Sequence, residues 1–172
     1  MPGYGLGIGE AAVTATGAIY DTLLSGGASS CVIIAIRNPT RNIIFMVHVP
    51  HGTANLSSIV DFIRTNVIQG TPAGSMEVEL ASQTFGQSNA GDSNLVQLIR
   101  ANLTQIGLVV RTEHASTSMS LNVNGDFIPG ANAANASRQA SDDSNGALSF
   151  KILSPAIAPL PDGRAKSKES PI

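Results

Sequence analysis

The fold is decided by the stretch from Ser25 to His51, which reads SGGASSCVIIAIRNPTRNIIFMVHVPH. It contains two apolar runs, residues 32–36 and 43–48, separated by a polar segment with a turn at Asn38-Pro39. Runs of this kind, rich in β-branched residues and almost continuously apolar, are typical of central strands buried on both faces. The sequence therefore predicts two neighbouring strands joined by a short polar turn.

The same stretch holds the only cysteine of the chain and two of its three histidines. If the strands are neighbours, Cys31 at the start of one meets His48 near the end of the other. A thiolate is the attacking species in cysteine catalysis, and an adjacent imidazole lowers the thiol pKa by stabilising the ion pair. The pattern favours a nucleophilic site, although a lone cysteine is more often a small core residue. The alternative for His48 is a purely structural role at the end of a strand. His51 could then supply the imidazole in its place.

Small residues before Cys31 indicate a second part of this site. Gly26, Gly27 and the serines Ser29 and Ser30 allow a tight turn whose backbone amides converge on one point. Convergent amides beside a nucleophile form an oxyanion hole. We therefore expect Ser29 and Ser30 to belong to the oxyanion loop.

Composition excludes several functional classes. The chain has 172 residues, enough for one domain with a proper core, and a net charge of −2 that offers no basic face to nucleic acid. No apolar run approaches the roughly 20 residues of a membrane span, and the first residues do not resemble a secretory signal. A single cysteine favours a reducing compartment. We expect no metal and no cofactor, because no Cys/His/Asp/Glu cluster has ligand spacing.

Glycine alternates along the first residues, at Gly3, Gly5, Gly7 and Gly9. A phosphate-binding glycine loop follows a strand and opens a helix, whereas this segment precedes a strand-like stretch. Close backbone packing is therefore the preferred interpretation.

The remaining chain alternates between strand and helix patterns. Apolar residues at helical spacing predict amphipathic helices over 56–69 and 93–106, each followed by glycine. Alternation predicts a strand over 76–80 with one solvated face, carrying glutamates 77 and 79, and Asn124-Gly125 predicts a hairpin turn.

These elements predict an α+β domain, a β-sandwich of mixed sheets with two amphipathic helices packed against it. Residues 129–146 lack periodicity and are expected to form a long surface loop. The domain is expected to span residues 1–153, and residues 154–172, with proline and alternating charge, to form a disordered tail.

Three segments together resemble CheD, the family of bacterial chemoreceptor glutamine deamidases. They are Gly7-Ile8-Gly9-Glu10-Ala11-Ala12-Val13, Ser29-Ser30-Cys31-Val32 and Met46-Val47-His48-Val49-Pro50. The interval of 17 positions between Cys31 and His48 is similar to that of the family. Ser25 stands where the family has a threonine, and Ser29 where it has a glycine. The resemblance covers most of residues 5–128.

This resemblance implies a cysteine-dependent protein-glutamine glutaminase. Cys31 is then the nucleophile, His48 the acid and base, and Ser25 the residue that orients the imidazole. The implied partner is a protein with a surface glutamine, either a chemoreceptor in the bacterial cytoplasm or a host protein. In the second case the chain is a delivered effector, as in the cytotoxic necrotising factors, whose deamidating domains have a similar Cys/His site. The alternatives are a CheD-like binding module without activity, and related acyl chemistry such as transamidation or ester hydrolysis.

Overall fold

The computed structural model describes residues 2–86, 94–132, 136–138 and 148–157. Ten strands and two α-helices lie within these ranges, and they build an α+β fold from two mixed sheets. The strands are β1 (Gly3–Leu6), β2 (Glu10–Ala15), β3 (Thr22–Ser25), β4 (Val32–Asn38), β5 (Ile43–Val49), β6 (Glu77–Ser82), β7 (Val110–Ala115), β8 (Met119–Asn122), β9 (Phe127–Pro129) and β10 (Ser149–Ile152). The helices are α1 (Ser57–Ile63), continued by a π-helical turn (Arg64–Ile68), and α2 (Asn94–Gln105).

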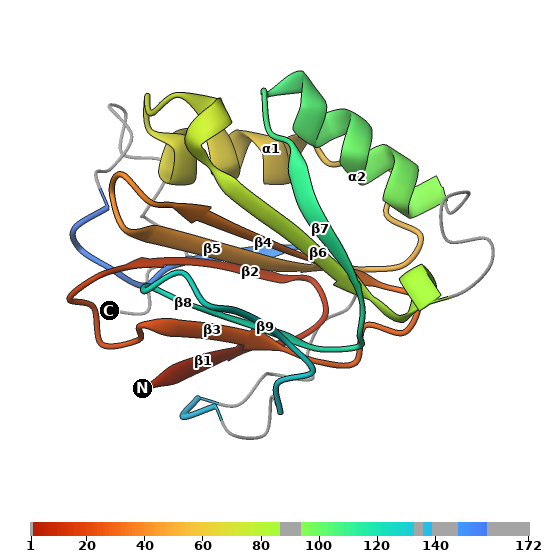
Figure 1. The fold of residues 1–172 in the computed structure, drawn as a ribbon, viewed down its shortest axis with the longest axis horizontal. Helices are drawn as coiled ribbons and strands as arrows, with labels where there is room; N and C mark the ends of the chain where they lie inside the picture. Colours follow the sequence, from red (N-terminus) through yellow and green to blue (C-terminus); the bar gives the residue numbers. More distant parts are fainter. Residues whose placement is uncertain (1, 87–93, 133–135, 139–147, 158–172) are drawn as a thin grey trace.

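Three layers result. The described strands form a six-stranded sheet in the order β10-β2-β5-β4-β6-β7 and a four-stranded sheet in the order β1-β3-β8-β9. Helices α1 and α2 cover one face of the larger sheet, and the smaller sheet covers the other (Figure 1). The predicted α+β fold with mixed sheets and two helices is confirmed.

The central strands of the larger sheet are buried on both faces, as their sequence predicts. In β4 the side chains of Val32, Ile34 and Ile36 join the core beneath the helices. Those of Ile33 and Ala35 join the core between the two sheets. Alternation along one strand thus supplies both hydrophobic layers.

The strand that carries the glutamates differs from expectation. Val78 and Leu80 face the helices, but the opposite face of β6 is only partly solvated: the Glu77 side chain is 29% exposed, whereas Glu79 is 6% exposed. Its carboxylate contacts the side chains of Arg111 and His114 on β7, and Glu77 contacts Arg37 on β4. Buried carboxylates require such partners. The alternating pattern therefore corresponds here to a row of ion-paired side chains, formed by Glu77 and Glu79 with their basic partners, rather than to a solvated face.

Four other predicted segments differ in detail. The first predicted helix changes to a π-helical turn after Ile63, and the second begins at Asn94, so its predicted N-terminal cap at residues 92–93 falls outside the described residues. Within the predicted surface loop 129–146, residues 136–138 lie against β1, where Arg138 forms an isolated bridge with Tyr4. Past residue 153, Ile157 is buried against the helix-side core, whereas residues 158–172 of the predicted tail lie outside the described residues.

Gly3 illustrates the close packing expected of the N-terminal glycines. A Cβ atom at Gly3 would lie 2.5 Å from Leu24 Cδ1 and 3.6 Å from Ala136 Cα. We expect Gly3→Ala to lower the free energy of unfolding by about 1 kcal/mol, because one side-chain tip must move in a packed core. The matched control is Gly74→Ala, whose added Cβ meets no described atom within 4 Å. Urea denaturation of both variants tests this, and equal unfolding midpoints would contradict it.

Candidate functional site

The pairing of β4 with β5 places Cys31 and His48 on one face of the larger sheet. Ile33 lies directly opposite His48 in the register, and Cys31 precedes Ile33 by two residues. Both Cys31 and Ile33 belong to the core between the sheets. Cys31 is therefore the diagonal neighbour of His48 across the two strands.

Burial distinguishes the residues of this region. His48 is completely buried and Cys31 is 8% exposed, whereas Ser29 and Ser30 are exposed. Cys31 therefore lies at the border between core and surface, whereas His48 lies inside the core. His51 is exposed in the turn after β5, so His48, and not His51, shares the inter-sheet face with Cys31.

Ser25 reaches the imidazole from the other sheet. It ends β3, is 1% exposed, and its Oγ lies 2.8 Å from His48 Nδ1 and 2.8 Å from the Leu6 carbonyl oxygen. Ser25 and His48 thus meet between the sheets, in the layer to which Cys31 also belongs.

These two hydrogen bonds determine the tautomer of His48. The Leu6 carbonyl can only accept, so the single hydroxyl proton of Ser25 is donated to it. The remaining bond then requires Nδ1–H of His48 to donate to Ser25 Oγ. The neutral imidazole therefore carries its lone pair on Nε2.

Nε2 of His48 is buried and has no hydrogen-bond partner among the described residues. The Nε2 lone pair is therefore not engaged by any described donor and is available to accept a proton. Burial also lowers the pKa of His48 from 6.5 to about 4, because the charged imidazolium is poorly solvated there. At neutral pH the site therefore holds an uncharged base, and burial disfavours the thiolate–imidazolium pair that the sequence suggested.

The loop before Cys31 is anchored at both sides. The Ala28 amide donates to the Thr117 carbonyl at 2.9 Å, and the Ala28 carbonyl accepts from the Gln83 amide at 2.9 Å. Ser82 Oγ donates to the Cys31 carbonyl at 2.7 Å. The sequence alone does not indicate this role of Ser82, because a serine that closes a strand has no distinguishing pattern.

The amides of the loop are not equally available. The Ser29 amide donates to the Gly27 carbonyl at 3.0 Å and is already engaged. No backbone acceptor is found among the described residues for the amides of Ser30 and Cys31. Of the expected oxyanion loop, the Ser30 and Cys31 amides are therefore the free donors beside the thiol.

Glu10 is a neighbour of His48 that the sequence analysis did not single out. The register Ala11–Val47, continued by one residue, places Glu10 opposite His48, and the Gly9 amide donates to the His48 carbonyl at 2.9 Å. Glu10 is 6% exposed and pairs with Arg138. The sequence does contain a signal for Glu10, because it is a charged residue at the start of an otherwise largely apolar strand.

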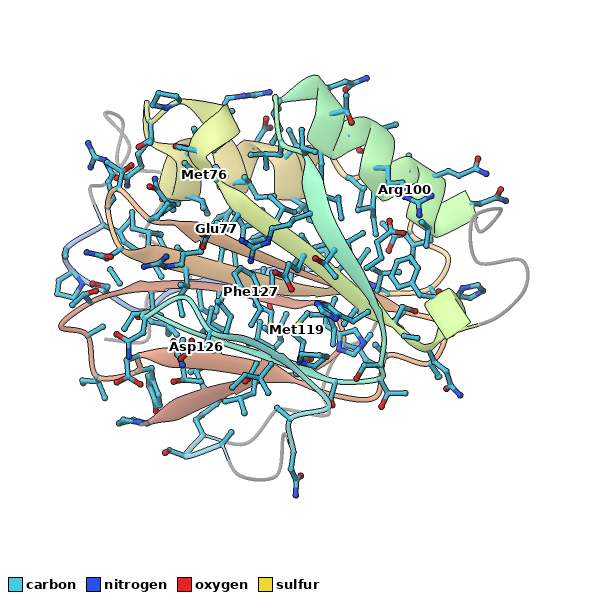
Figure 2. All side chains as sticks on the ribbon, viewed as in Figure 1. Met76, Glu77, Arg100, Met119, Asp126 and Phe127 are labelled. Atoms are coloured by element: carbon cyan, nitrogen blue, oxygen red, sulfur yellow. The ribbon has the colours of Figure 1, made fainter. Side chains whose placement is uncertain are left out.

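A second polar region lies away from Cys31 in the β6–β7 part of the sheet. The Arg111 guanidinium contacts Glu77 and Glu79 and lies 5.1 Å from the centre of the Phe127 ring. Figure 2 shows Phe127 of β9 below the strand that bears Glu77. Since each cation here has a carboxylate partner, this charged row serves to join β6, β7 and β9.

A surface hollow of about 670 Å³ lies between α2 and β7. It is lined by Arg100, Thr104 and residues 109–113, and contains none of the three candidate residues. Arg100 in it forms a two-point ion pair with Glu113. The hollow therefore offers no uncompensated charge to a ligand.

Within the described ranges, no group of three or more His, Cys, Asp and Glu side chains has the arrangement of a metal site. No helix among those residues is long and apolar enough to span a membrane.

Comparisons with known proteins give little further information. No protein-family model matches the sequence, and no curated protein is significantly similar to it. Among solved structures, the hypothetical protein YfiH of Bacillus licheniformis has a TM-score of 0.37 and 14% identity over 55% of this chain. The match spans 46% of the YfiH chain, and a likeness this weak carries no functional argument.

Proposed function

We propose that this protein is a cysteine-dependent protein-glutamine deamidase, with Cys31 as nucleophile and His48 as acid and base. The observation that carries the proposal is the buried Nε2 of His48, which has no partner among the described residues and lies on the strand next to the one that Cys31 precedes. Ser25 accepts the Nδ1 proton of His48, so the lone pair of the neutral ring is on Nε2. A base held in one tautomer next to a nucleophile is the arrangement that acyl transfer requires.

The first half-reaction forms a thioester. Nε2 accepts the Cys31 proton as the sulfur attacks the carboxamide carbon of a glutamine side chain. The negative charge that develops on the carboxamide oxygen is stabilised by the amides of Ser30 and Cys31. The imidazolium then gives its proton to the departing nitrogen, the carbon–nitrogen bond breaks, and ammonia leaves.

The second half-reaction regenerates the enzyme. Neutral His48 takes a proton from water as the water oxygen attacks the thioester carbon. The carbon–sulfur bond breaks, the sulfur recovers the proton from the imidazolium, and the product is a glutamate side chain. Because burial lowers the pKa of His48 to about 4, the imidazolium is a strong proton donor at both stages.

A protein side chain is the proposed substrate for two reasons. Cys31 adjoins the exposed residues Ser29 and Ser30, a surface that a glutamine of another protein can approach. The resemblance of the Ser25, Cys31 and His48 pattern to the CheD family implies the same class of substrate. A chemoreceptor and a host protein are its two candidate sources.

The test uses bacterial and eukaryotic lysates incubated with the purified protein in water enriched in oxygen-18. Peptide mass spectrometry should find glutamines converted to glutamate with one heavy oxygen, because the second half-reaction adds one water oxygen. Cys31→Ala should abolish this conversion. Ser30→Ala is the matched control, since it removes an exposed hydroxyl beside Cys31 and keeps the backbone amide.

The origin of the converted peptide separates chemotaxis from action on a host. Conversion that persists in Cys31→Ala would overturn the assignment of the nucleophile. Absence of conversion in both lysates would overturn the deamidase proposal in favour of a binding module.

A further inference from the structure

The network around His48 extends to Arg138, which lies 90 positions further along the chain. Arg138 lies beside β1, where the Gly5 amide donates to the Arg138 carbonyl at 2.8 Å and the Arg138 amide donates to the Gly3 carbonyl at 3.1 Å. Its guanidinium lies 4.3 Å from the centre of the Tyr4 ring. Backbone and side chain together hold this residue against the N-terminal strand.

The guanidinium of Arg138 also binds both ends of the segment from Gly5 to Glu10, which connects β1 to β2. It donates to the Gly5 carbonyl and to both carboxylate oxygens of Glu10, each at 3.2 Å. Glu10 in turn accepts from the Gly7 amide at 2.8 Å. Leu6 is thus enclosed between Gly5 and Gly7, both of which are bound to this ion pair.

Leu6 is the residue whose carbonyl decides the tautomer of His48. The bond between Ser25 and His48 can form in either direction, because a hydroxyl both donates and accepts. Only the Leu6 carbonyl, by taking the hydroxyl proton, obliges Nδ1 to be the donor. If that carbonyl moved, the Ser25 hydroxyl would be free to donate to Nδ1, and the imidazole proton would pass to Nε2.

We propose that the Glu10–Arg138 ion pair is a positioning element that holds His48 with its proton on Nδ1 and its lone pair on Nε2, acting through Leu6 and Ser25. The ion pair touches neither the thiol nor the reacting atoms, so its effect is exerted through the hydroxyl. The inference deepens the proposed function, on which its catalytic meaning rests. The tautomer itself is measurable without any substrate.

The experiment is nitrogen-15 NMR of the imidazole groups in the full chain at neutral pH, with the His48→Gln spectrum used to assign His48. In the wild type, Nε2 should have the shift of an unprotonated ring nitrogen and Nδ1 that of a protonated one. Arg138→Gln should shift the tautomer ratio by roughly 2- to 10-fold, the equilibrium equivalent of one neutral hydrogen bond. The tautomer ratio in Arg138→Lys should lie between those of the wild type and Arg138→Gln, since lysine keeps the charge but lacks the planar guanidinium that binds two acceptors at once.

Arg100→Gln is the matched control, because it breaks the two-point ion pair with Glu113 on the other side of the larger sheet. Its His48 signals should equal those of the wild type. If Arg138→Gln does not fold, Glu10→Gln removes the same ion pair from its other side. A wild-type tautomer in folded Arg138→Gln or Glu10→Gln would overturn the positioning role.

Deamidation kinetics separate this inference from the proposed function. If the chain is a deamidase, Arg138→Gln should lower kcat and leave KM unchanged, because substrate contacts are intact. If no deamidation is found in any variant, the proposed function fails, whereas the tautomer shift still tests the ion pair.

Discussion

Replacing His48 with glutamine is expected to slow deamidation by roughly 10²- to 10⁴-fold, the usual contribution of a positioned acid–base group. A glutamine side chain retains hydrogen-bonding capacity toward Ser25 but cannot accept or return a proton near neutral pH. Both half-reactions use His48, so neither thioester formation nor its hydrolysis would be assisted. The rate of ammonia release from a converted peptide measures the effect.

His51→Gln is the matched control for this variant. His51 lies three positions further along the chain but is exposed and outside the site, so the variant should retain the wild-type rate. Alkylation of Cys31 by iodoacetamide gives a second readout, and it should slow about tenfold or more in His48→Gln, because Nε2 no longer accepts the thiol proton as the sulfur attacks. Wild-type rates in both assays would remove His48 from the mechanism.

The protein should lose about 3 kcal/mol of its unfolding free energy between pH 6.5 and pH 4 through His48 alone. Its pKa is 6.5 when exposed and about 4 in the folded state, where burial opposes the charge. As pH falls through this window, the unfolded chain binds a proton at His48 before the folded chain does. Protonation therefore favours unfolding, and below pH 4 both states are protonated and the loss is complete.

Urea denaturation of wild type and His48→Gln across this pH range checks the prediction. Titration of the carboxylates is common to both proteins, so the difference between the two curves isolates His48. His51→Gln should follow the wild type, because that side chain is exposed. Parallel curves for wild type and His48→Gln would contradict the burial effect.

Much of the fold is predictable from local patterns. The central strands, the helical segments and the Asn124-Gly125 hairpin are found where periodicity and turn residues place them. Pairing of consecutive strands across short turns, as in β4 with β5, follows from the same patterns. Such features depend on residues close in sequence, so local chemistry is sufficient to specify them.

Other features depend on which strands become neighbours. Glu79 has the alternation of a solvated face, but Arg111 of the neighbouring strand β7 pairs with it, and Phe127 of β9 lies against Arg111. The parallel pairings of β6 with β7 and of β2 with β10 join segments distant in sequence. No local pattern indicates that a particular glutamate will be buried by a strand formed some thirty residues later.

The candidate site divides in the same way. The sequence by itself determined that Cys31 comes directly before one buried strand and His48 lies near the end of the next, because the apolar runs and the turn between them favour that pairing. Only the tertiary structure decided that the imidazole is neutral and has its lone pair on Nε2. That property depends on burial between two sheets, on the Leu6 carbonyl and on Arg138, and these partners are brought together by packing rather than by proximity in the chain.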